Sequence, residues 1–315
     1  MICALVLSGC GGGLKEFSDK RMLMGTVFEI KIFARDESSA GKSISEAFDE
    51  ISRLEKIFSV FIPDSEVSKL NGSGIDAVSS EMLELMKISK YYSEISAGAF
   101  DITVLPLIEL WKNSKKEGKM PSTAAIEKAK KLVGSKKIFI DGKNKRITFA
   151  EKGMKVDFGG IAKGYAVDRA YELLKKNGVE AGMVNAGGNM RVWGDRVWNV
   201  ALQNPRDKTE YVTVLRLKNE SVATSGDYER YFFLDKKRVS HIINPLSGYS
   251  ADKSISATII TKNATDADAL STAVFVLGPE KGIGLIEKIK NAECLVIDNK
   301  RKIHKSFEFD KYEKF

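Results

Sequence analysis

The sequence predicts an α+β fold in which mostly antiparallel sheets are flanked by helices. Three observations support this prediction. Runs rich in β-branched and aromatic residues outnumber the helical patterns, several of these runs are separated only by a short turn, and the Gly-x-Gly-x-x-Gly fingerprint of a doubly wound nucleotide-binding fold is absent. The 315 residues, 43% hydrophobic and 29% charged, have the composition of a globular protein.

The amino-terminal half is expected to contain a strand, three helices and a hairpin. Residues 22–33 are β-branched and aromatic with partial alternation, which predicts a strand. Residues 137–141 and 146–149 flank a Gly-Lys-Asn turn, which predicts a β-hairpin. The segments with the apolar spacing of amphipathic helices are residues 37–58, 79–95 and 122–133.

The carboxyl-terminal half is expected to consist mainly of strands, with two or three helices among them. The strand-forming runs are residues 181–184, 197–202, 211–217, 230–234, 239–243, 254–260 and 292–297. No linker, low-complexity tract or repeat interrupts the chain. We therefore expect residues 21–315 to form a single domain.

The charge of the chain is positive but dispersed. Fifty Lys and Arg against 42 Asp and Glu give a formal net charge of +8. The positive residues occur in short clusters beside Gly, Asn and Asp, a pattern typical of solvated turns and not of a nucleic-acid-binding stripe, so we expect no nucleic-acid partner. The mean hydropathy of −0.18, with no run of 18 apolar residues, excludes a membrane-spanning helix in this sequence.

The three cysteines exclude a disulfide framework in a chain of this length, and their spacing fits no zinc site. Cys294 lies in the apolar run Glu293-Cys294-Leu295-Val296-Ile297, which predicts a buried, small apolar residue.

The first residues suggest a lipid anchor. Leu7-Ser8-Gly9-Cys10 follows a short apolar run and precedes three glycines, which resembles a bacterial lipobox whose cysteine is acylated. Because the apolar run is short and lacks a basic start, we expect residues 1–20 to be a truncated lipoprotein signal and tether. Cys10 would then be the lipidation site and hold the protein outside the cytoplasm, on the periplasmic face of an inner membrane or on the outer cell face. The alternative is a leader with an incidental cysteine.

Two glycine-rich segments can bring backbone N–H groups close to an anion. In residues 157–168, Gly159-Gly160 opens a helix that carries Lys163 near its first turn, and Asp157 can accept hydrogen bonds from a ligand. The alternative is a strand-to-helix turn in which Asp157 caps the helix. Residues 185–189 contain a second Gly-Gly pair that could bring backbone N–H groups close to an anion in the same way. The alternative is an ordinary hairpin turn.

A third segment, residues 264–272, begins a helix and also has two interpretations. Thr265 and Asp268 have the spacing of a capping-box variant, and spacing alone favours that interpretation. Asp268 and Thr272 are four residues apart, so that a carboxylate and a hydroxyl share one helical face and could bind Mg²⁺.

The chain has two histidines. His304 is expected to be an exposed strand residue. His241 lies where a strand enters a Pro/Gly turn, a common place for functional residues, although a structural role is the alternative. The unperturbed imidazole pKa of about 6.5 would make His241 a ready general base.

Taken together and in order, seven segments resemble the signature segments of the FAD:protein FMN transferase (ApbE) family. They span residues 22–290 and are Met24-Gly25-Thr26, Gly98-Ala99-Phe100-Asp101-Ile102-Thr103, residues 157–168, Val184-Asn185-Ala186-Gly187-Gly188, Ala223-Thr224-Ser225-Gly226-Asp227-Tyr228, His241-Ile242-Ile243-Asn244-Pro245 with Gly248, and Ala267-Asp268-Ala269-Leu270-Ser271-Thr272. The lipobox agrees with this resemblance, since many members of the family are lipoproteins.

The resemblance implies a Mg²⁺-dependent enzyme with an ApbE-like catalytic domain. It would split FAD at the pyrophosphate, attach FMN by a phosphoester bond to a Thr or Ser of an acceptor flavoprotein, and release AMP. His241 would deprotonate the acceptor hydroxyl, with Lys163 and Asp268 as the other catalytic residues. By the same resemblance, the metal ligands are Asp268, Thr272, the Gly160 carbonyl and Ser271. The FAD-pocket residues that it implies are Met24, Phe61, Ala99, Phe100, Asp101, Asp157, Lys163 and Ile242.

Two alternative functions remain open from the sequence. The same residues could make a Mg²⁺-dependent FAD pyrophosphatase that releases FMN and AMP, or the chain could be a flavin-binding lipoprotein without turnover. For the transferase, the acceptors implied by the resemblance are subunits of Rnf-type or sodium-pumping quinone reductase complexes, or exported flavoproteins.

Overall fold

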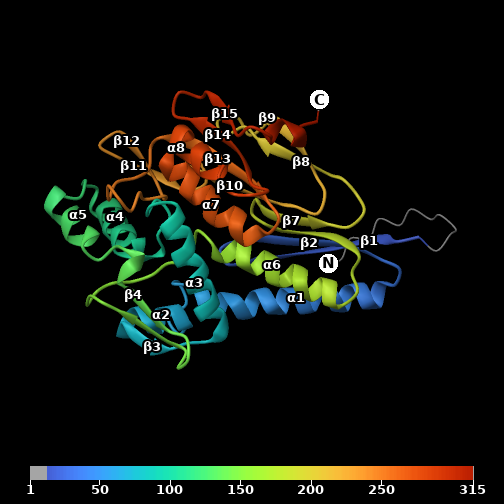
Figure 1. Cartoon of the computed structure of the whole chain (residues 1–315), viewed down its shortest axis with the longest axis horizontal. Helices are drawn as coiled ribbons and strands as arrows, with labels where there is room; N and C mark the ends of the chain where they lie inside the picture. Colours follow the sequence, from blue (N-terminus) through green and yellow to red (C-terminus); the bar gives the residue numbers. More distant parts are fainter. Residues whose placement is uncertain (1–12, 315) are drawn as a thin grey trace.

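The computed structural model describes residues 13–314, and its centre is an eight-stranded sheet (Figure 1). The strand order is β1-β2-β6-β7-β10-β13-β14-β15, and every neighbouring pair is antiparallel. The strands of this sheet are β1 (Lys15–Leu23), β2 (Thr26–Ala34), β6 (Ala181–Ala186), β7 (Asn189–Trp193), β10 (Ser221–Gly226), β13 (Ser254–Thr261), β14 (Glu293–Asp298) and β15 (Ile303–Lys305). The predicted α+β class with mostly antiparallel sheets is confirmed.

Three smaller sheets flank the large one. They are β3-β5-β4, β8-β9 and β11-β12, and all their pairs are antiparallel. Their strands are β3 (Ile75–Ala77), β4 (Ile138–Asp141), β5 (Arg146–Phe149), β8 (Trp198–Gln203), β9 (Tyr211–Leu217), β11 (Tyr231–Leu234) and β12 (Lys237–Ser240).

The helices lie mainly on one face of the large sheet. Figure 1 shows α1 and α6 side by side, with α7 next to α6, and α7 packs against β10 and β13. The α-helices are α1 (Glu37–Phe58), α2 (Glu66–Ser73), α3 (Ser80–Ile95), α4 (Leu105–Glu117), α5 (Thr123–Lys130), α6 (Ala162–Lys176), α7 (Ala264–Leu277) and α8 (Pro279–Ile286). The short 3₁₀ helices are η1 (Ile102–Val104), η2 (Ser135–Lys137) and η3 (Phe309–Tyr312).

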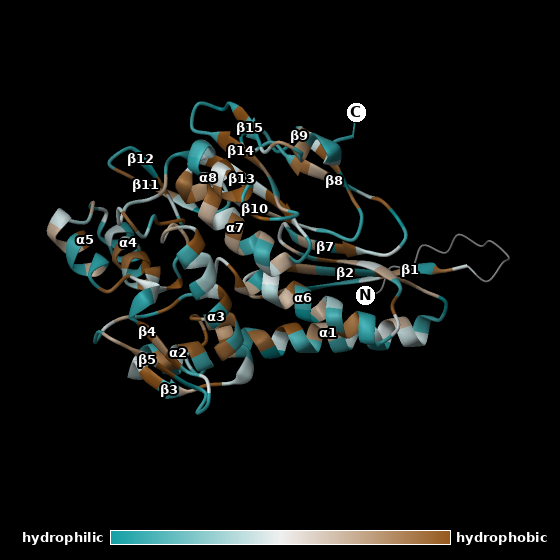
Figure 2. Ribbon diagram, in the orientation of Figure 1, coloured by the Kyte–Doolittle hydropathy of each residue, from teal (hydrophilic) through white to brown (hydrophobic). Residues whose placement is uncertain are grey.

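The amphipathic pattern of residues 37–58 predicted α1 at its observed bounds. Its apolar stripe is buried against the sheet and α6, while its polar face is exposed, as the brown and teal bands of Figure 2 show. Asp36 caps the helix by accepting a hydrogen bond from the Ser39 N–H at 2.7 Å. The helices predicted at 79–95 and 122–133 are also confirmed, the latter ending earlier, at Lys130.

The sheet has a hydrophobic core on each face. Alternate side chains of β2, among them Phe28 and Ile30, are fully buried on the helix side. On the other face, Leu215 and Leu217 of β9 pack with Phe309 of η3 in a second cluster. Every residue of β13 is buried, because this strand is covered on both faces.

The first predicted strand is wrong in its extent. Residues 22–33 contain the turn of a hairpin, with Met24 and Gly25 at φ of 50° and 71° between β1 and β2. β1 begins at Lys15, so residues 15–20, which we assigned to the tether, pair with β2 at the edge of the sheet. The predicted lipidation site, Cys10, lies outside the described residues.

Several elements escaped prediction from the sequence. β7 and β10 lie in the middle of the large sheet, yet β10 reads Ser-Val-Ala-Thr-Ser-Gly and lacks a strong β-forming pattern. α4 was also missed, although Pro106 in its first turn and Gly118, at φ 67° after its last, are residues typical of helix ends. The second half contains three helices, α6, α7 and α8, within the predicted two or three.

Two further expectations can be compared with the structure. Cys294 is buried in β14, and burial raises the pKa of its thiol to about 12, so the predicted apolar role is confirmed. Within residues 13–314, no helix has both the length and the apolar character needed to cross a bilayer.

Candidate functional site

The glycine-rich segment places a loop and the amino terminus of α6 at one corner of the molecule. The Asp157 backbone N–H donates to the Ile102 carbonyl at 2.7 Å, and the Asp157 carboxylate accepts from the Gly159 N–H at 2.8 Å. Asp157 therefore stabilises the loop ahead of α6. This agrees only in part with the alternative of a strand-to-helix turn, because Asp157 does not itself cap the helix. The residue at the N-cap position of α6 is Ile161, which provides no side-chain cap.

The carboxylate that caps α6 comes from α7. Asp268 is only 3% exposed, and its Oδ2 accepts a hydrogen bond from the Gly164 N–H at 2.9 Å. A Cβ on Gly164 would collide with the Ala264 carbonyl oxygen, so only glycine permits this approach of the two helices. The predicted capping box of Thr265 and Asp268 is wrong, because Asp268 satisfies the neighbouring helix and not its own.

The amino terminus of α7 is capped by two other residues. The Asn263 side chain accepts from the Asp266 N–H at 2.8 Å. Asp168 of α6 accepts from the backbone N–H groups of Ala264 and Thr265 at 2.9 and 2.8 Å. The two helices thus cap each other, which fixes Asp268 relative to the glycine-rich loop.

The hydroxyl groups predicted as ligands lie one turn beyond Asp268. Thr272 is partly exposed, and its Oγ1 would be 3.1 Å from a Cβ built on Gly160, so the loop and α7 meet at this point. Ser271 is fully buried, and its Oγ lies 2.8 Å from Ser225 Oγ and 2.9 Å from the Asp268 carbonyl oxygen. The Ser271 hydroxyl therefore has two protein partners, and one of them, Ser225 of β10, stands in a signature segment but was assigned no role from the sequence.

This donor set fits a magnesium ion. Asp268, Thr272 and the Gly160 carbonyl offer hard oxygen donors, and Asp268 Oδ1 has only a long 3.5 Å contact with Lys163 Nζ among the described residues. The residues that the structure describes contain no cluster of three or more His, Cys, Asp or Glu able to hold a metal. A site with one carboxylate suits Mg²⁺, which binds through few protein ligands together with substrate phosphates.

Lys163 connects these groups electrostatically. Its ammonium donates to the Gly159 carbonyl at 2.9 Å as well as reaching Asp268. Burial raises the pKa of the Asp157 carboxyl, while the Gly159 N–H and the charges of Lys112 and Lys163 oppose that shift. The anionic group of a ligand bound at this corner would thus lie close to the Lys163 ammonium and to the glycine-rich loop.

His241 lies immediately after β12 and is fixed by the residue that precedes β11. Its backbone N–H and its Nδ1 each lie 3.0 Å from the Arg230 carbonyl oxygen. A carbonyl can only accept, so Nδ1 carries the proton and Nε2 keeps the lone pair. The histidine is exposed on one side, but surrounding protein atoms displace water and, with the charges of Lys163 and Arg230, lower its pKa to about 4. The expected ordinary pKa is therefore wrong, and the imidazole is neutral at pH 7.

Two segments far apart in sequence meet beside His241. Arg230 Nη2 donates to the Gly25 carbonyl at 3.0 Å, which ties the hairpin β11–β12 to the turn between β1 and β2. In that turn, the Met24 N–H donates to Glu55 Oε1 of α1 at 2.7 Å. Ile242, which follows His241, is buried. The turn that contains Met24 is thus tied through Arg230 to His241, and Ile242 is the next residue in the chain.

The predicted aromatic residues differ in exposure. Phe100 is buried beside Gly160, at 3.3 Å from the position of a Cβ there, and Ala99 is buried next to it. Phe61 is 72% exposed, and the Lys112 ammonium lies 4.9 Å from its ring centre. Because Lys112 also influences Asp157, these residues belong to the same region of the surface.

Asp101 has a demonstrable structural role. Its Oδ1 accepts from the Thr103 N–H at 2.9 Å, and its Oδ2 accepts from the Ser135 N–H at 2.9 Å and from Ser93 Oγ at 3.3 Å. The carboxylate joins α3, η1 and η2 and is 7% exposed. A flavin contact by Asp101 remains a prediction.

The remaining sequence candidates are structural. Gly187 and Gly188, at φ of 57° and 98°, form the turn between β6 and β7, so the hairpin alternative is confirmed for residues 185–189. His304 lies on β15 as expected, but it is partly buried and its Nε2 is 2.8 Å from Asp298 Oδ2.

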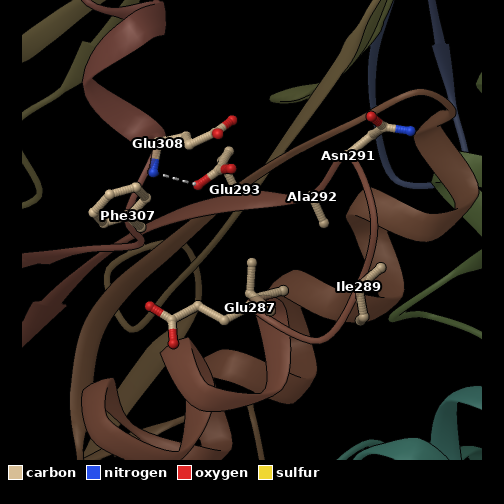
Figure 3. Close-up of a pocket in the computed structure, with 8 residues that line it drawn as sticks. Glu287, Ile289, Asn291, Ala292, Glu293, Phe307 and Glu308 are labelled. Carbon is tan, nitrogen blue, oxygen red and sulfur yellow. Dashed lines mark hydrogen bonds between the residues drawn. The ribbon is translucent and has the colours of Figure 1, made fainter.

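A separate pocket of about 450 Å³ lies between α8, β14 and the segment before η3 (Figure 3). It is lined by Ile286, Glu287, Ile289, Asn291, Ala292, Glu293, Phe307 and Glu308. The Glu293 carboxylate there accepts from the Glu308 N–H at 3.3 Å and from Ser306 Oγ. None of the predicted site residues lines this pocket.

Comparison with known proteins points to one family. The model of the ApbE family matches residues 24–296. The FAD:protein FMN transferase of Klebsiella pneumoniae (strain 342) is 32% identical over 294 residues, covering 92% of this chain and 91% of the relative.

Solved structures show the same fold. The crystal structure of the ApbE protein from Thermotoga maritima aligns with a TM-score of 0.89 and 33% identity, covering 96% of this chain and 100% of that one. The Pseudomonas stutzeri flavinyl transferase ApbE, in its apo form, gives a TM-score of 0.84 and 30% identity over 96% of this chain and 98% of that one. This chain therefore belongs to the ApbE family.

Proposed function

We propose that this protein is a FAD:protein FMN transferase that requires Mg²⁺. The observation that carries the proposal is the meeting of the Gly159-Gly160 loop, Lys163 and the Asp268–Thr272 face at one corner, in a chain related to FAD:protein FMN transferases. Transfer of a phosphoryl group depends mainly on charge neutralisation and positioning, which this corner can supply.

Asp268, Thr272 and the Gly160 carbonyl are the residues that would hold the magnesium ion. The bound ion would neutralise negative charge on the FAD pyrophosphate during transfer. Lys163 adds a second positive charge, and its hydrogen bond to the Gly159 carbonyl keeps that charge over the loop. The reciprocal caps between α6 and α7 hold these groups in place before substrate arrives.

The acceptor side of the reaction depends on His241. The oxygen of an acceptor Thr or Ser forms a bond to the FMN phosphorus, and the bond from that phosphorus to the bridging oxygen breaks. AMP leaves with the bridging oxygen, and the hydroxyl proton goes to the free lone pair on Nε2 of His241. A neutral imidazole is present at pH 7 because its pKa is low, and a nearby pyrophosphate would raise that pKa towards an effective value for a base.

A FAD pyrophosphatase is the second candidate. Its supporting observation is that His241 is exposed on one side, where a water molecule could take the place of the acceptor hydroxyl. The products would then be free FMN and AMP.

The proposal also includes where the enzyme acts and which proteins it modifies. If Cys10 is acylated, the enzyme is anchored to a membrane outside the cytoplasm, where its acceptors would be exported flavoproteins or subunits of Rnf-type or sodium-pumping quinone reductase complexes. Mass spectrometry of membrane fractions would show lipid on Cys10 if this is correct, and an unmodified Cys10 would contradict it.

The test of the transferase uses purified protein, FAD, Mg²⁺ and the soluble domain of an Rnf-type FMN-bearing subunit. We expect in-gel flavin fluorescence on the acceptor, a mass increase equal to one FMN, and one AMP for each label. AMP release that is equal with and without the acceptor, with no label, would establish the pyrophosphatase instead. Intact FAD after prolonged incubation would contradict both enzymes and support the non-catalytic flavin-binding lipoprotein.

A further inference from the structure

The hairpin β11–β12 presents an aromatic surface next to the candidate site. Tyr231 and Phe233 are 47% and 63% exposed, and their rings form an edge-to-face pair with centroids 5.8 Å apart. The residue between them, Phe232, faces inward with Leu234 and packs against α4 and α5. The hairpin is therefore supported on one face and leaves two large aromatic side chains uncovered on the other.

The same hairpin is positively charged. Residues 230–240 contain Arg230, Lys236, Lys237 and Arg238 against a single carboxylate, Asp235. Arg238 lies 3.8 Å from the centre of the Tyr231 ring, and Arg230 is committed to the Gly25 carbonyl. Lys236 and Lys237 are exposed at the tip, so they are the charges free to meet a partner.

The positive charge continues along α4 towards the predicted flavin pocket. A groove of about 570 Å³ on this helix is lined by Glu109, Lys112, Asn113, Lys115 and Lys116. The Lys115 ammonium lies 5.3 Å from the Phe232 ring of β11, and that of Lys112 lies 4.9 Å from the Phe61 ring. The lysines of α4 thus lie between the hairpin and Phe61, the aromatic residue expected at the flavin pocket. Figure 1 shows α4 and the hairpin side by side.

The hairpin is also joined to the general base. Arg230, just before β11, accepts both hydrogen bonds of His241, and His241 directly follows β12. Arg230 and His241 thus lie at the base of the hairpin, so a macromolecule held by the hairpin would lie close to the exposed His241, which the acceptor hydroxyl has to reach.

We propose that the outer face of this hairpin, with Tyr231 and Phe233, together with its exposed tip, with Lys236 and Lys237, docks the acceptor protein through an acidic segment flanking its target Thr or Ser. The proposal rests on the transferase function. The exposed aromatic pair would supply the apolar contact and the lysines the charge complementarity, which is the usual division of roles at protein interfaces.

The test compares two double variants, Tyr231→Ser with Phe233→Ser and Lys236→Glu with Lys237→Glu, using the Rnf-type acceptor domain at saturating FAD. We expect each to raise the acceptor KM by about tenfold, corresponding to the loss of one or two interface contacts. The kcat, the affinity for FAD and the AMP released without acceptor should stay at the parent values. Matched controls are Phe307→Ser, an 89% exposed aromatic residue near the pocket of Figure 3, and Lys300→Glu with Lys302→Glu.

A charge exchange gives the sharpest readout. Replacing the acidic residues beside the target Thr of the acceptor by Lys should weaken labelling by the parent, and the Lys236→Glu, Lys237→Glu enzyme should restore it. A KM equal to that of the controls, or no restoration, would overturn the proposal. So would an unchanged KM combined with loss of binding to phosphatidylglycerol vesicles, because the hairpin would then be a membrane contact.

Failure of the transferase function can be recognised separately. In that case the parent enzyme itself leaves no label on the acceptor domain. Surface plasmon resonance with the same domain would still measure docking without chemistry. Loss of binding in the hairpin variants, but not in the controls, would support the docking surface, and equal binding in all variants would refute it.

Discussion

The two sides of the candidate site differ in how their groups are held. On the α6–α7 side, Asp168 caps α7, Asp268 caps α6, and both carboxylates are buried. On the hairpin side, Tyr231 and Phe233 are uncovered, and His241 is held mainly by a single carbonyl. Fixed charges suit a phosphoryl group whose transfer requires positioning, whereas an exposed surface suits a protein that must arrive and leave.

This contrast implies that substitutions on the helix side can change stability, chemistry or both, whereas those on the hairpin side change chemistry or docking alone. The rate of acceptor labelling and the thermal unfolding temperature, Tm, are independent measurements that separate these effects, and chemical denaturation and the pH dependence of kcat/KM supplement them.

The largest effect is expected for Asp268→Asn. The amide oxygen can still accept the Gly164 N–H, so Tm should change little, but the charge facing Lys163 and the proposed metal is lost. We expect labelling to slow by about 10²–10³-fold, the typical cost of removing a group that stabilises the transition state.

The companion variant Asp268→Ala removes the cap as well. It should show the same loss of labelling together with a lower Tm, because an unpaired helix amino terminus costs about 1 kcal/mol. An Asp268→Asn enzyme that labels at the parent rate would refute the catalytic role, and equal Tm values for the two variants would refute the cap.

The second effect is expected for His241→Gln. Labelling should fall by about 10²-fold, the usual contribution of general-base catalysis, while the affinity for FAD and the Tm at pH 7 remain unchanged. His304→Gln is the matched control, because His304, on β15, bonds Asp298 of β14 and none of the candidate residues. A similar loss in the control would show that the effect is structural.

The parent enzyme should also have an unusual acid limb in its pH profile. The base form of His241 is lost as pH falls through its pKa of about 4, so kcat/KM should stay level from pH 8 down to about pH 5 and fall below that. The lowered pKa also makes the unfolded chain bind the proton more readily between pH 6.5 and 4, so the contribution of His241 to stability decreases as pH falls through that window. An acid limb near pH 6.5 that disappears in His241→Gln would contradict the lowered pKa.

The smallest effect on chemistry is expected for Asp168→Asn. Asp168 accepts from the amino terminus of α7 and from Arg191 Nη1 at 2.6 Å, so loss of its charge weakens several hydrogen bonds. We expect the free energy of unfolding to fall by about 1–3 kcal/mol, with labelling reduced only modestly. Chemical denaturation measures the change, and Asp195→Asn, at an exposed surface pair with Lys218, should leave stability unchanged. Equal stability of the two variants would show that the cap across the helices is unimportant.

Local sequence signals were sufficient for much of the fold. The apolar stripe of residues 37–58 predicted α1 at both ends, because its period and its cap are encoded within one segment. β10 was missed because its small and hydroxyl side chains become a central strand only through pairing with β7 and β13. Whether a strand lies at the edge or in the centre of a sheet depends on its pairing partners, which the segment itself does not contain.

The candidate site divides in the same way. The glycine-rich loop and the Asp268–Thr272 spacing were visible as motifs, and the chain order of these motifs suggested the family. Lys112 and Arg230 were not singled out, and Asp168 and Ser225, although they stand in signature segments, were assigned no role, because each acts on residues of a different element. No periodicity within the sequence indicates which groups from distant segments will approach one another.

The sequence by itself determined the α+β class, the principal helices and the residue types able to meet a pyrophosphate, because these follow from short-range spacing and side-chain chemistry. Only the tertiary structure decided that Asp268 caps the neighbouring helix and not its own, and that His241 is neutral at pH 7. Both outcomes depend on how closely α7 approaches α6 and on how protein atoms surround the imidazole, and these distances arise when separate elements pack together.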